Sequence, residues 1–344
     1  MKKVTMLVIM ALFLPFKGRL GEVYAQVAAQ MKLWDQKHRF PKVNAVEFKG
    51  DEASLSMYDA IYGHGAMWEN EFMGFRVYMD HRQSIDLYGK KKPQLELDST
   101  NFYTTPEQMA QGYGEDILFV GASIGAGSFR GYVDGAPVFI NPVDSRGQRV
   151  VNEGPDSAIV EVYATNWIYG NDTLQVCQRF TARRGHREVQ VDVKIVESGE
   201  KSVDDLLFCT GVQKLQRRNA GLMRSDGLVG SWGSNAPDQN NPDMLETLGI
   251  GVCVPEKYLI EVKEDSLNYL CVVHPVAGHI RYCIVAASDM QQQGGFHSSQ
   301  AWFTWLKEIF INHIPINEST EIRRDIRRFR GQHLKRKKNR RGSK

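Results

Sequence analysis

Hydrophobic and polar residues alternate strictly over residues 189–195, where three valines and an isoleucine are separated by Gln190, Asp192 and Lys194. A period of two places apolar side chains on one face of a strand and polar side chains on the other. Similar apolar runs recur along the chain, broken by Gly, Asn, Asp and Pro. This density of short strands predicts an all-β sandwich or barrel. The further strands are expected at 159–164, 174–180, 206–215, 258–262, 269–274 and 280–287.

Helical signals are few. Thr105 precedes Pro106 and Gln108, so we expect Thr105 to cap a helix while the Gln108 side chain reaches back to the cap. A second helix is expected to start at Ser298 or Ser299, because apolar residues follow at helical spacing. Residues 22–38 also show a helical pattern. No internal repeat interrupts the chain, and residues 234–243 are typical of a surface loop, so we expect one continuous domain over residues 26–320.

The N-terminus has the layout of a signal peptide. Two lysines precede an uncharged apolar run over residues 4–16, and Val23 and Ala25 fit the −3 and −1 positions of a cleavage site. The run is shorter than the ~20 residues that a spanning helix needs. We therefore expect residues 1–25 to be removed, leaving a periplasmic or secreted protein without stable membrane insertion.

Charge is distributed unevenly. Residues 321–344 hold 12 basic and 2 acidic side chains, whereas the rest of the chain holds 31 basic and 38 acidic ones. We expect the basic segment to be a disordered tail, because it has too little apolar content to bury. Phe329 is its one aromatic carbocycle, so a nucleic-acid role is not expected.

The cysteines and histidines do not suggest a cofactor or a metal site. Five cysteines without close pairs indicate buried free thiols, and the absence of Cys-x-x-Cys excludes a structural zinc site of that kind. His274, His279 and His297 could supply an acid or a metal ligand, but they lack ligand spacing. We therefore name no metal and no cofactor.

The segment from His64 to Lys90 carries the main candidate chemistry. If residues 75–82 are extended, Arg76, Tyr78, Asp80 and Arg82 form one polar face, with same-face neighbours about 7 Å apart. Such a row suits a polar ligand, although its charges could also simply pair with each other on a solvated surface. The glycines at 63 and 65, a neighbouring tryptophan and nearby carboxylates favour the functional interpretation. General acid–base catalysis at a glycosidic centre requires a pair of carboxyl groups.

Roles can be assigned within this segment as hypotheses. Glu69 or Asp80 would transfer protons, Tyr78 would stack or donate a proton, and Arg76 would hold a substrate carboxylate. The remaining substrate-binding candidates come from this segment and from two later positions, where an exposed lysine and a turn anchor are the simpler interpretations; they are Trp68, Arg82, Asp86, Lys214 and Trp232.

The glycine-rich stretch 121–131 contains a Gly-x-Ser-x-Gly match around Ser123. A nucleophile elbow must open a helix, and Gly125 and Gly127 oppose one. A phosphate-binding loop also needs a following helix. We therefore expect a tight turn rather than an esterase serine or a phosphate site.

The same residues resemble a known family, the domain-of-unknown-function family 4861. The resemblance covers about residues 51–310 and leaves residues 311–344 outside. It implies an exported protein of polysaccharide-degrading bacteria and a galactose-mutarotase-like β-supersandwich. The residues that carry it are 65–71 (GAMWENE), 74–80 (GFRVYMD), 85–86 (ID) and 89–90 (GK), followed by 113–118 (YGEDIL) and 120–127 (VGASIGAG).

Together these observations predict an exported carbohydrate-active enzyme whose substrate is an oligosaccharide or polysaccharide. The arginines and Lys214 favour acidic, uronate-containing sugars. Hydrolase, lyase and epimerase chemistry all stay open, because carboxylate, Tyr, His and Arg side chains on one sheet can support each of them. The alternative is a non-catalytic carbohydrate-binding module, in which aromatic platforms should outnumber charged groups.

Overall fold

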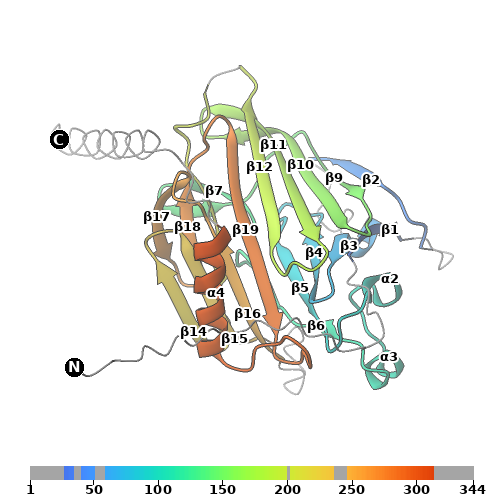
Figure 1. The fold of residues 1–344 in the computed structure, drawn as a ribbon. Coiled ribbons are helices and arrows are strands. Elements are labelled where there is room, and N and C mark those ends of the chain that lie inside the picture. Colours follow the sequence, from blue (N-terminus) through green and yellow to red (C-terminus); the bar gives the residue numbers. More distant parts are fainter. Residues whose placement is uncertain (1–26, 35–39, 51–58, 200–201, 236–245, 314–344) are drawn as a thin grey trace, which may run out of the picture.

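The computed structural model describes residues 27–34, 40–50, 59–199, 202–235 and 246–313. The expected signal peptide and basic tail both lie outside the described residues. Within them, antiparallel strands dominate and three helices lie at the periphery (Figure 1). The helices are α2 (Leu97–Thr100), α3 (Pro106–Ala110) and α4 (Ser299–His313).

The strands form three sheets. The nine-stranded sheet has the order β14 (Arg217–Arg224), β15 (Leu228–Asn235), β16 (Glu246–Cys253), β19 (His279–Ser288), β12 (Val189–Glu197), β11 (Asp172–Arg183), β10 (Ser157–Tyr169), β9 (Ser145–Asn152) and β2 (Ala45–Lys49). One five-stranded sheet has the order β1 (Ala28–Leu33), β3 (Ile61–Glu69), β4 (Met73–Tyr78), β5 (Ile85–Gly89) and β6 (Glu115–Asp116). The other has the order β17 (Leu259–Glu264), β18 (Asn268–Val273), β13 (Phe208–Gln213), β7 (Arg130–Val133) and β8 (Ala136–Val138).

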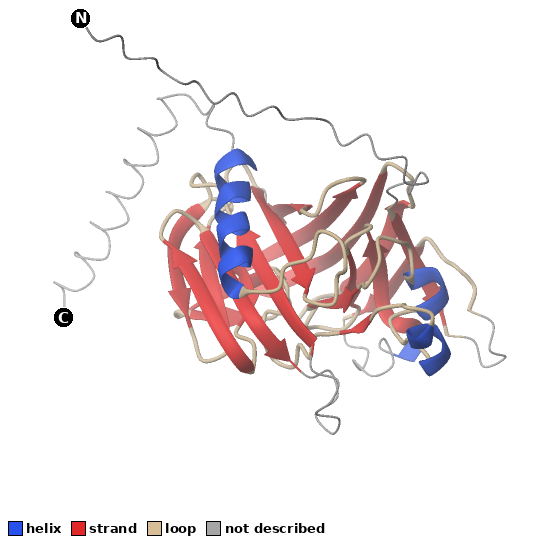
Figure 2. Ribbon diagram, turned by 60° about the horizontal axis from the view of Figure 1, so that its bottom comes forward, coloured by secondary structure: helices blue, strands red, loops and turns tan. Residues whose placement is uncertain are grey.

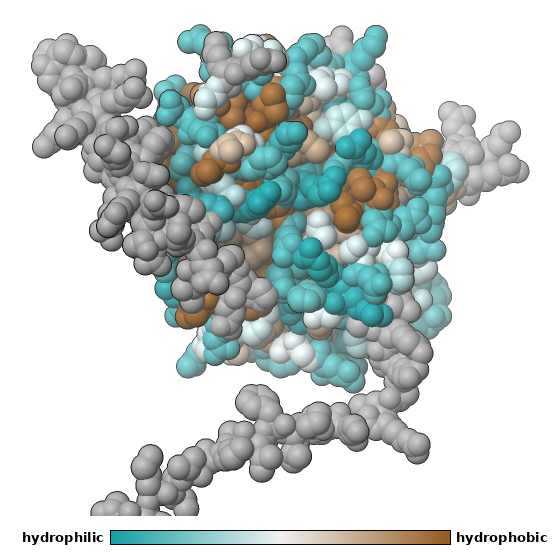
Figure 3. All heavy atoms as spheres, turned by 45° about the horizontal axis from the view of Figure 1, so that its top comes forward, coloured by the Kyte–Doolittle hydropathy of each residue, from teal (hydrophilic) through white to brown (hydrophobic). Residues whose placement is uncertain are grey.

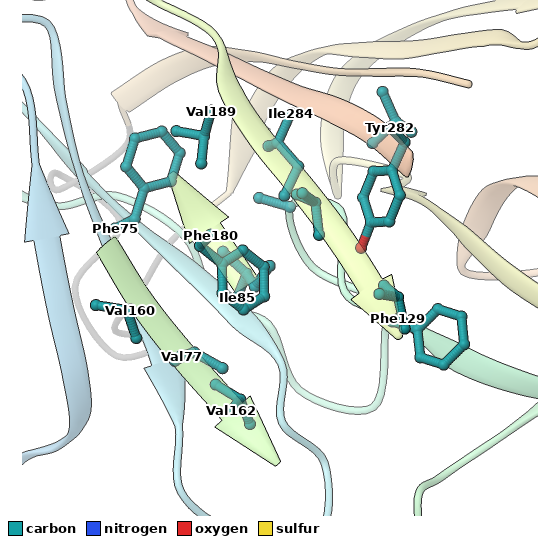
Figure 4. Close-up of a cluster of buried hydrophobic side chains, with 14 of the residues drawn as sticks. Phe75, Val77, Ile85, Phe129, Val160, Val162, Phe180, Val189, Tyr282 and Ile284 are labelled. Carbon is teal, nitrogen blue, oxygen red and sulfur yellow. The ribbon is translucent and has the colours of Figure 1, made fainter. Parts of the chain in front are cut away.

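One continuous core joins the three sheets. Along β12, buried and solvent-accessible residues alternate as the sequence pattern predicts, so its valines face the core. Figure 4 shows apolar side chains of the β4–β5 layer, including Phe75 and Val77, meeting Val160 and Phe180 of the large sheet. The prediction of an all-β supersandwich is confirmed, because a large sheet packs its apolar face against two smaller ones.

Helix α4 covers part of the large sheet from outside (Figure 2). Trp302 and Leu306 are buried against β15 and β16 in a second apolar cluster. Gly249 provides the space, since a Cβ there would lie 2.6 Å from the Trp302 ring. The predicted second helix is therefore confirmed with its apolar face inward. The Thr105 capping box at α3 is also confirmed, with both reciprocal hydrogen bonds formed.

Two local predictions were wrong. Residues 28–33 form strand β1 instead of a helix, because pairing with β3 outweighs the local helical pattern. The extended segment that was expected to reach Arg82 ends at Tyr78, after which the chain turns. Gln83 adopts a φ of 44° and its amide donates to the carbonyl of Asp80 at 3.1 Å.

The surface and the remaining side chains agree with a folded globular body. Figure 3 shows a face on which hydrophilic residues predominate and hydrophobic residues form separate small patches. All five cysteines are free thiols, as predicted; Cys209, Cys253 and Cys271 are buried, whereas Cys177 and Cys283 are partly exposed. No helix in the described ranges is both long and apolar enough to cross a membrane.

Candidate functional site

The sheet β1–β3–β4–β5–β6 has two chemically different faces. Trp68 and Phe75 stack on each other at a ring distance of 5.5 Å on the inner face, and Trp68 continues onto Phe180 of the large sheet at 5.0 Å. On the outer face, Met67 pairs with Arg76, which pairs with Asp86 on the next strand. The register therefore places an arginine and an aspartate side by side, away from the core.

Arg76 and Asp86 form a buried ion pair at the centre of this outer face. Asp86 Oδ2 accepts from Arg76 Nη2, and also from the Tyr78 hydroxyl at 2.7 Å. Its other oxygen accepts from the Leu87 amide at 2.9 Å. Burial lowers the pKa of Arg76, but the carboxylates around it, Asp86 first, raise the pKa well above the ordinary value. Arg76 and Asp86 thus form a fixed charged platform.

Asp116 supplies a second carboxyl to the same guanidinium. It comes from β6, two strands away from Arg76, and its Oδ2 lies 3.1 Å from Arg76 Nη2. Unlike the 1% exposed side chain of Asp86, that of Asp116 is 21% exposed. Burial and repulsion from Asp86 raise its pKa to about 8, against the lowering effect of Arg76. Asp116 is therefore a carboxyl that keeps its proton at neutral pH while touching solvent.

Two tyrosine hydroxyls lie around the Arg76 guanidinium, and a strained residue lies beside one of the two rings. The Tyr103 hydroxyl accepts from Arg76 Nη1 at 3.1 Å, and Tyr103 is 45% exposed. Burial raises the pKa of Tyr78 far beyond its ordinary value, so Tyr78 stays a hydrogen-bond donor. His64, whose ring lies 6.0 Å from that of Tyr103, has a φ of 66°. A non-glycine residue in that region costs energy and is enriched at functional sites.

Asp80 and Arg82 lie beside this group rather than in its row. They occupy the turn after β4, where Asp80 accepts from the Arg82 side chain at 2.5 Å and from the Arg82 amide at 2.9 Å. The predicted four-residue strand face is therefore wrong beyond Tyr78. Arg82 still reaches the site, because its guanidinium lies 5.1 Å from the centre of the Tyr78 ring.

Glu69 has a different environment from the one predicted. It is buried, and its two oxygens accept from Lys90 Nζ at 2.5 Å and from the amides of Glu96 and Leu97 at 2.9 Å. Lys90 is also buried and donates to the carbonyls of Asn70 and Gln94 at 2.7 Å. Glu69 therefore anchors the start of α2 to the sheet, and this geometry does not fit proton transfer to a substrate.

Three other substrate-binding candidates lie away from the Arg76 cluster. Trp68 is 1% exposed, and its stacking partners are the core rings of Phe75 and Phe180, so sugar stacking on it is excluded. Trp232 is buried beneath α4, with its ring 6.5 Å from Trp302. Lys214 pairs with Glu264 at 2.8 Å at the edge of the other small sheet.

The remaining sequence candidates have local partners. Ser123 Oγ lies 2.6 Å from Gln213 Oε1 within a turn, as expected for a structural serine. His279 pairs with Asp192 and His297 with Asp289, both on the surface. Among the described residues, no group of three or more His, Cys, Asp or Glu side chains is arranged to hold a metal ion.

Sequence reasoning did not identify Asp116 and Tyr103 as site residues. Asp116 is 40 residues from Arg76, and only the pairing of β5 with β6 brings the two together. The one available signal was the Glu-Asp pair inside the second block of the family resemblance.

Comparisons with known proteins identify a family and similar solved structures. No curated protein matches the chain. A solved structure described as "Putative kojibiose phosphorylase from human microbiome" is similar with a TM-score of 0.43 and 10% identity. The alignment covers 84% of this chain and 37% of that one, so this chain spans little more than a third of its neighbour's length. A family model described as a domain of unknown function, DUF4861, matches residues 19–311, and the chain therefore belongs to the DUF4861 family.

Proposed function

We propose that this protein is a carbohydrate-active enzyme that performs acid–base chemistry on an oligosaccharide at the outer face of β4, β5 and β6. The observation that carries the proposal is Asp116, a partly exposed carboxyl whose pKa is raised to about 8 beside a buried arginine. A carboxylic acid that keeps its proton at neutral pH can protonate a sugar oxygen. The proton-transfer role that the sequence suggested for Glu69 or Asp80 is therefore assigned to Asp116.

Arg76 completes the acid function. When Asp116 gives its proton to the substrate oxygen, a negative charge develops on its carboxylate. Arg76 Nη2 lies 3.1 Å from that carboxylate and stabilises the charge. Asp86 is a positioning residue here, because it fixes both Arg76 and the Tyr78 hydroxyl.

The rim supplies groups suited to a sugar. Tyr103 offers an exposed ring for stacking, and Tyr78 offers a hydroxyl that stays protonated. His64 is the neighbouring group that could receive a proton. Hydrolysis, elimination and epimerisation can each use a proton donor and a proton acceptor of this kind. Product analysis therefore decides the reaction class.

A non-catalytic carbohydrate-binding role is the second candidate. The exposed Tyr103 ring favours it, since aromatic platforms dominate such modules. The raised pKa of Asp116 favours the enzyme instead, because a binding site has no use for a shifted proton donor.

Incubation of the purified protein with pectic and glycosaminoglycan oligosaccharides, read by mass spectrometry, tests the proposal. Added water identifies a hydrolase and an unsaturated product identifies a lyase. An unchanged mass with a changed sugar identity by NMR identifies an epimerase. Measurable binding without any conversion would favour the binding module. The absence of both binding and conversion would contradict both candidate functions.

We also propose that the protein is exported. The basic start, the uncharged run over residues 4–16 and the small residues at Val23 and Ala25 support this. Intact-mass analysis of the periplasmic fraction should find a chain that begins near Gln26, and full-length protein in the cytoplasm would contradict it.

A further inference from the structure

A second polar cluster lies beside the Asp116 site, around the turn that follows β4. Two neighbouring strands hold this turn in place. Gln148 of β9 donates to the carbonyls of Val77 and Tyr78 at 3.0 and 3.2 Å. Arg130 of β7 donates to Ser84 Oγ at 2.7 Å.

Arg146 is the unusual member of this cluster. It lies two residues before Gln148 on β9, so the two side chains share a face of the strand. Arg146 is 1% exposed, and its Nη2 donates to Asn141 Oδ1 at 3.0 Å. Its Nε and Nη1 are buried without a hydrogen-bond partner in the described part of the chain. A buried guanidinium with two unsatisfied donors is costly unless an acceptor is supplied.

The charges around the turn are unbalanced. Three guanidinium groups, those of Arg82, Arg130 and Arg146, gather around one carboxylate, Asp80. That carboxylate is already bound by Arg82. Burial lowers the pKa of His81, and the three arginines lower it further against the raising effect of Asp80, so the His81 ring adds no positive charge of its own. The cluster therefore has an excess of positive charge that no described carboxylate neutralises.

We infer that this cluster, Arg146 with Arg82 and Arg130, binds the anionic group of the substrate, a carboxylate or a sulfate ester on a sugar. The inference rests on the proposed function and deepens it by naming the substrate class. Arg146 supplies the unpartnered donors, and the anion approaches over Arg82, whose side chain is 28% exposed. Because Arg82 lies 5.1 Å from the Tyr78 ring, a sugar bound at Tyr78 can direct its acidic group here.

This assignment replaces the role that the sequence suggested for Arg76. Arg76 is already paired with Asp86, and Asp116 occupies the same Nη2, so Arg76 has no unpartnered charge left for a substrate. In the described residues, Arg146 Nε and Nη1 have no hydrogen-bond partner. The acidic-sugar preference therefore depends on β9 and on the turn after β4, not on the middle of β4.

Calorimetry with galacturonate, a galacturonate trimer, galactose and inorganic sulfate tests the inference on the full chain. The variants are Arg146→Met, Arg146→Lys and, as a matched control on the same strand, Arg149→Met. Arg149 is exposed and pairs with Glu161. We expect the wild type and Arg149→Met to bind the acidic probes in preference to galactose. Arg146→Met should lose at least about tenfold in affinity for them, while Arg146→Lys should keep part of it.

Melting curves separate folding from binding. Without a ligand, Arg146→Met should melt at or above the wild-type temperature, because it removes a buried unpaired charge. Sulfate or galacturonate should raise the melting temperature of the wild type but not of this variant. If Arg146→Met fails to fold, Arg82→Gln replaces it and should weaken acidic probes several-fold.

Two results would overturn the inference: equal affinity of the wild type for galacturonate and galactose, or undiminished acidic binding by Arg146→Met. Both can occur while the enzyme still turns over neutral sugars, in which case the proposed function stands without the anion subsite. Conversely, acidic binding that depends on Arg146 without any turnover would keep the subsite and contradict the enzyme.

Discussion

The buried pair of Glu69 and Lys90 gives the sharpest test of a structural role against a catalytic one. Both side chains are at most 2% exposed, and Glu69 accepts three hydrogen bonds. Glu69→Gln removes the counter-charge of the Lys90 ammonium and puts an amide in place of one acceptor. Breaking a buried ion pair from one side costs about 3–5 kcal/mol. We therefore expect the free energy of unfolding to fall by about that amount.

Urea denaturation at pH 7, followed by tryptophan fluorescence, measures this loss. The double variant Glu69→Gln/Lys90→Met should regain about 2 kcal/mol relative to the single one, because it also removes the stranded charge. Glu107→Gln is the matched control. Glu107 is an exposed carboxylate in the first turn of α3, and its replacement should leave the urea midpoint nearly unchanged. If Glu69→Gln unfolds at the wild-type urea concentration yet loses turnover, Glu69 is catalytic and our assignment is refuted.

Three further predictions follow from the fold and the charges. The pKa of Asp116 is raised from 3.8 to about 8 on folding, so its stabilising contribution is full below pH 4 and is lost as the pH rises towards 8. In urea titrations from pH 4 to 9, Asp116→Asn should therefore lose about 1–3 kcal/mol less stability with rising pH than the wild type does. An unchanged pH dependence would contradict the pKa shift. Trp232→Ala should lower the free energy of unfolding by about 3–5 kcal/mol without changing sugar affinity, because Trp232 packs beneath α4; a selective loss of sugar binding would restore it as a platform. Deleting residues 325–344 should leave the melting temperature nearly unchanged, since this basic segment has little apolar surface to bury, and a large drop in calorimetry would show that it docks.

Local patterns were sufficient for most of the fold. The alternation at 189–195 predicted β12, and the Thr105 pattern predicted α3, because each depends on residues close in sequence. Residues 28–33 were misinterpreted because their pairing partners on β3 lie 28 to 41 residues further along the chain, and only this pairing reveals the strand.

The candidate site was predicted only in part, because some of its residues are close in sequence and others come from distant strands. Arg76 and Tyr78 lie two residues apart on β4, so their shared face followed from parity, whereas Asp86 reaches Arg76 through the register between β4 and β5. The parity argument failed beyond Tyr78, where a turn with a positive φ at Gln83 interrupts the strand. Asp116 and Arg146 come from β6 and β9, and no local pattern connects them to β4.

The most direct test of the central claim is the turnover of Asp116→Asn on the oligosaccharide that the wild type converts. The asparagine keeps the shape and cannot donate a proton as an acid, so we expect kcat to fall by about 10²- to 10⁴-fold. In the wild type, the rate should also decline as the pH rises past about 8, where Asp116 ionises. Glu115→Gln, the adjacent carboxyl on the same strand, serves as the control and should keep most of the activity. Wild-type turnover in Asp116→Asn would contradict the account.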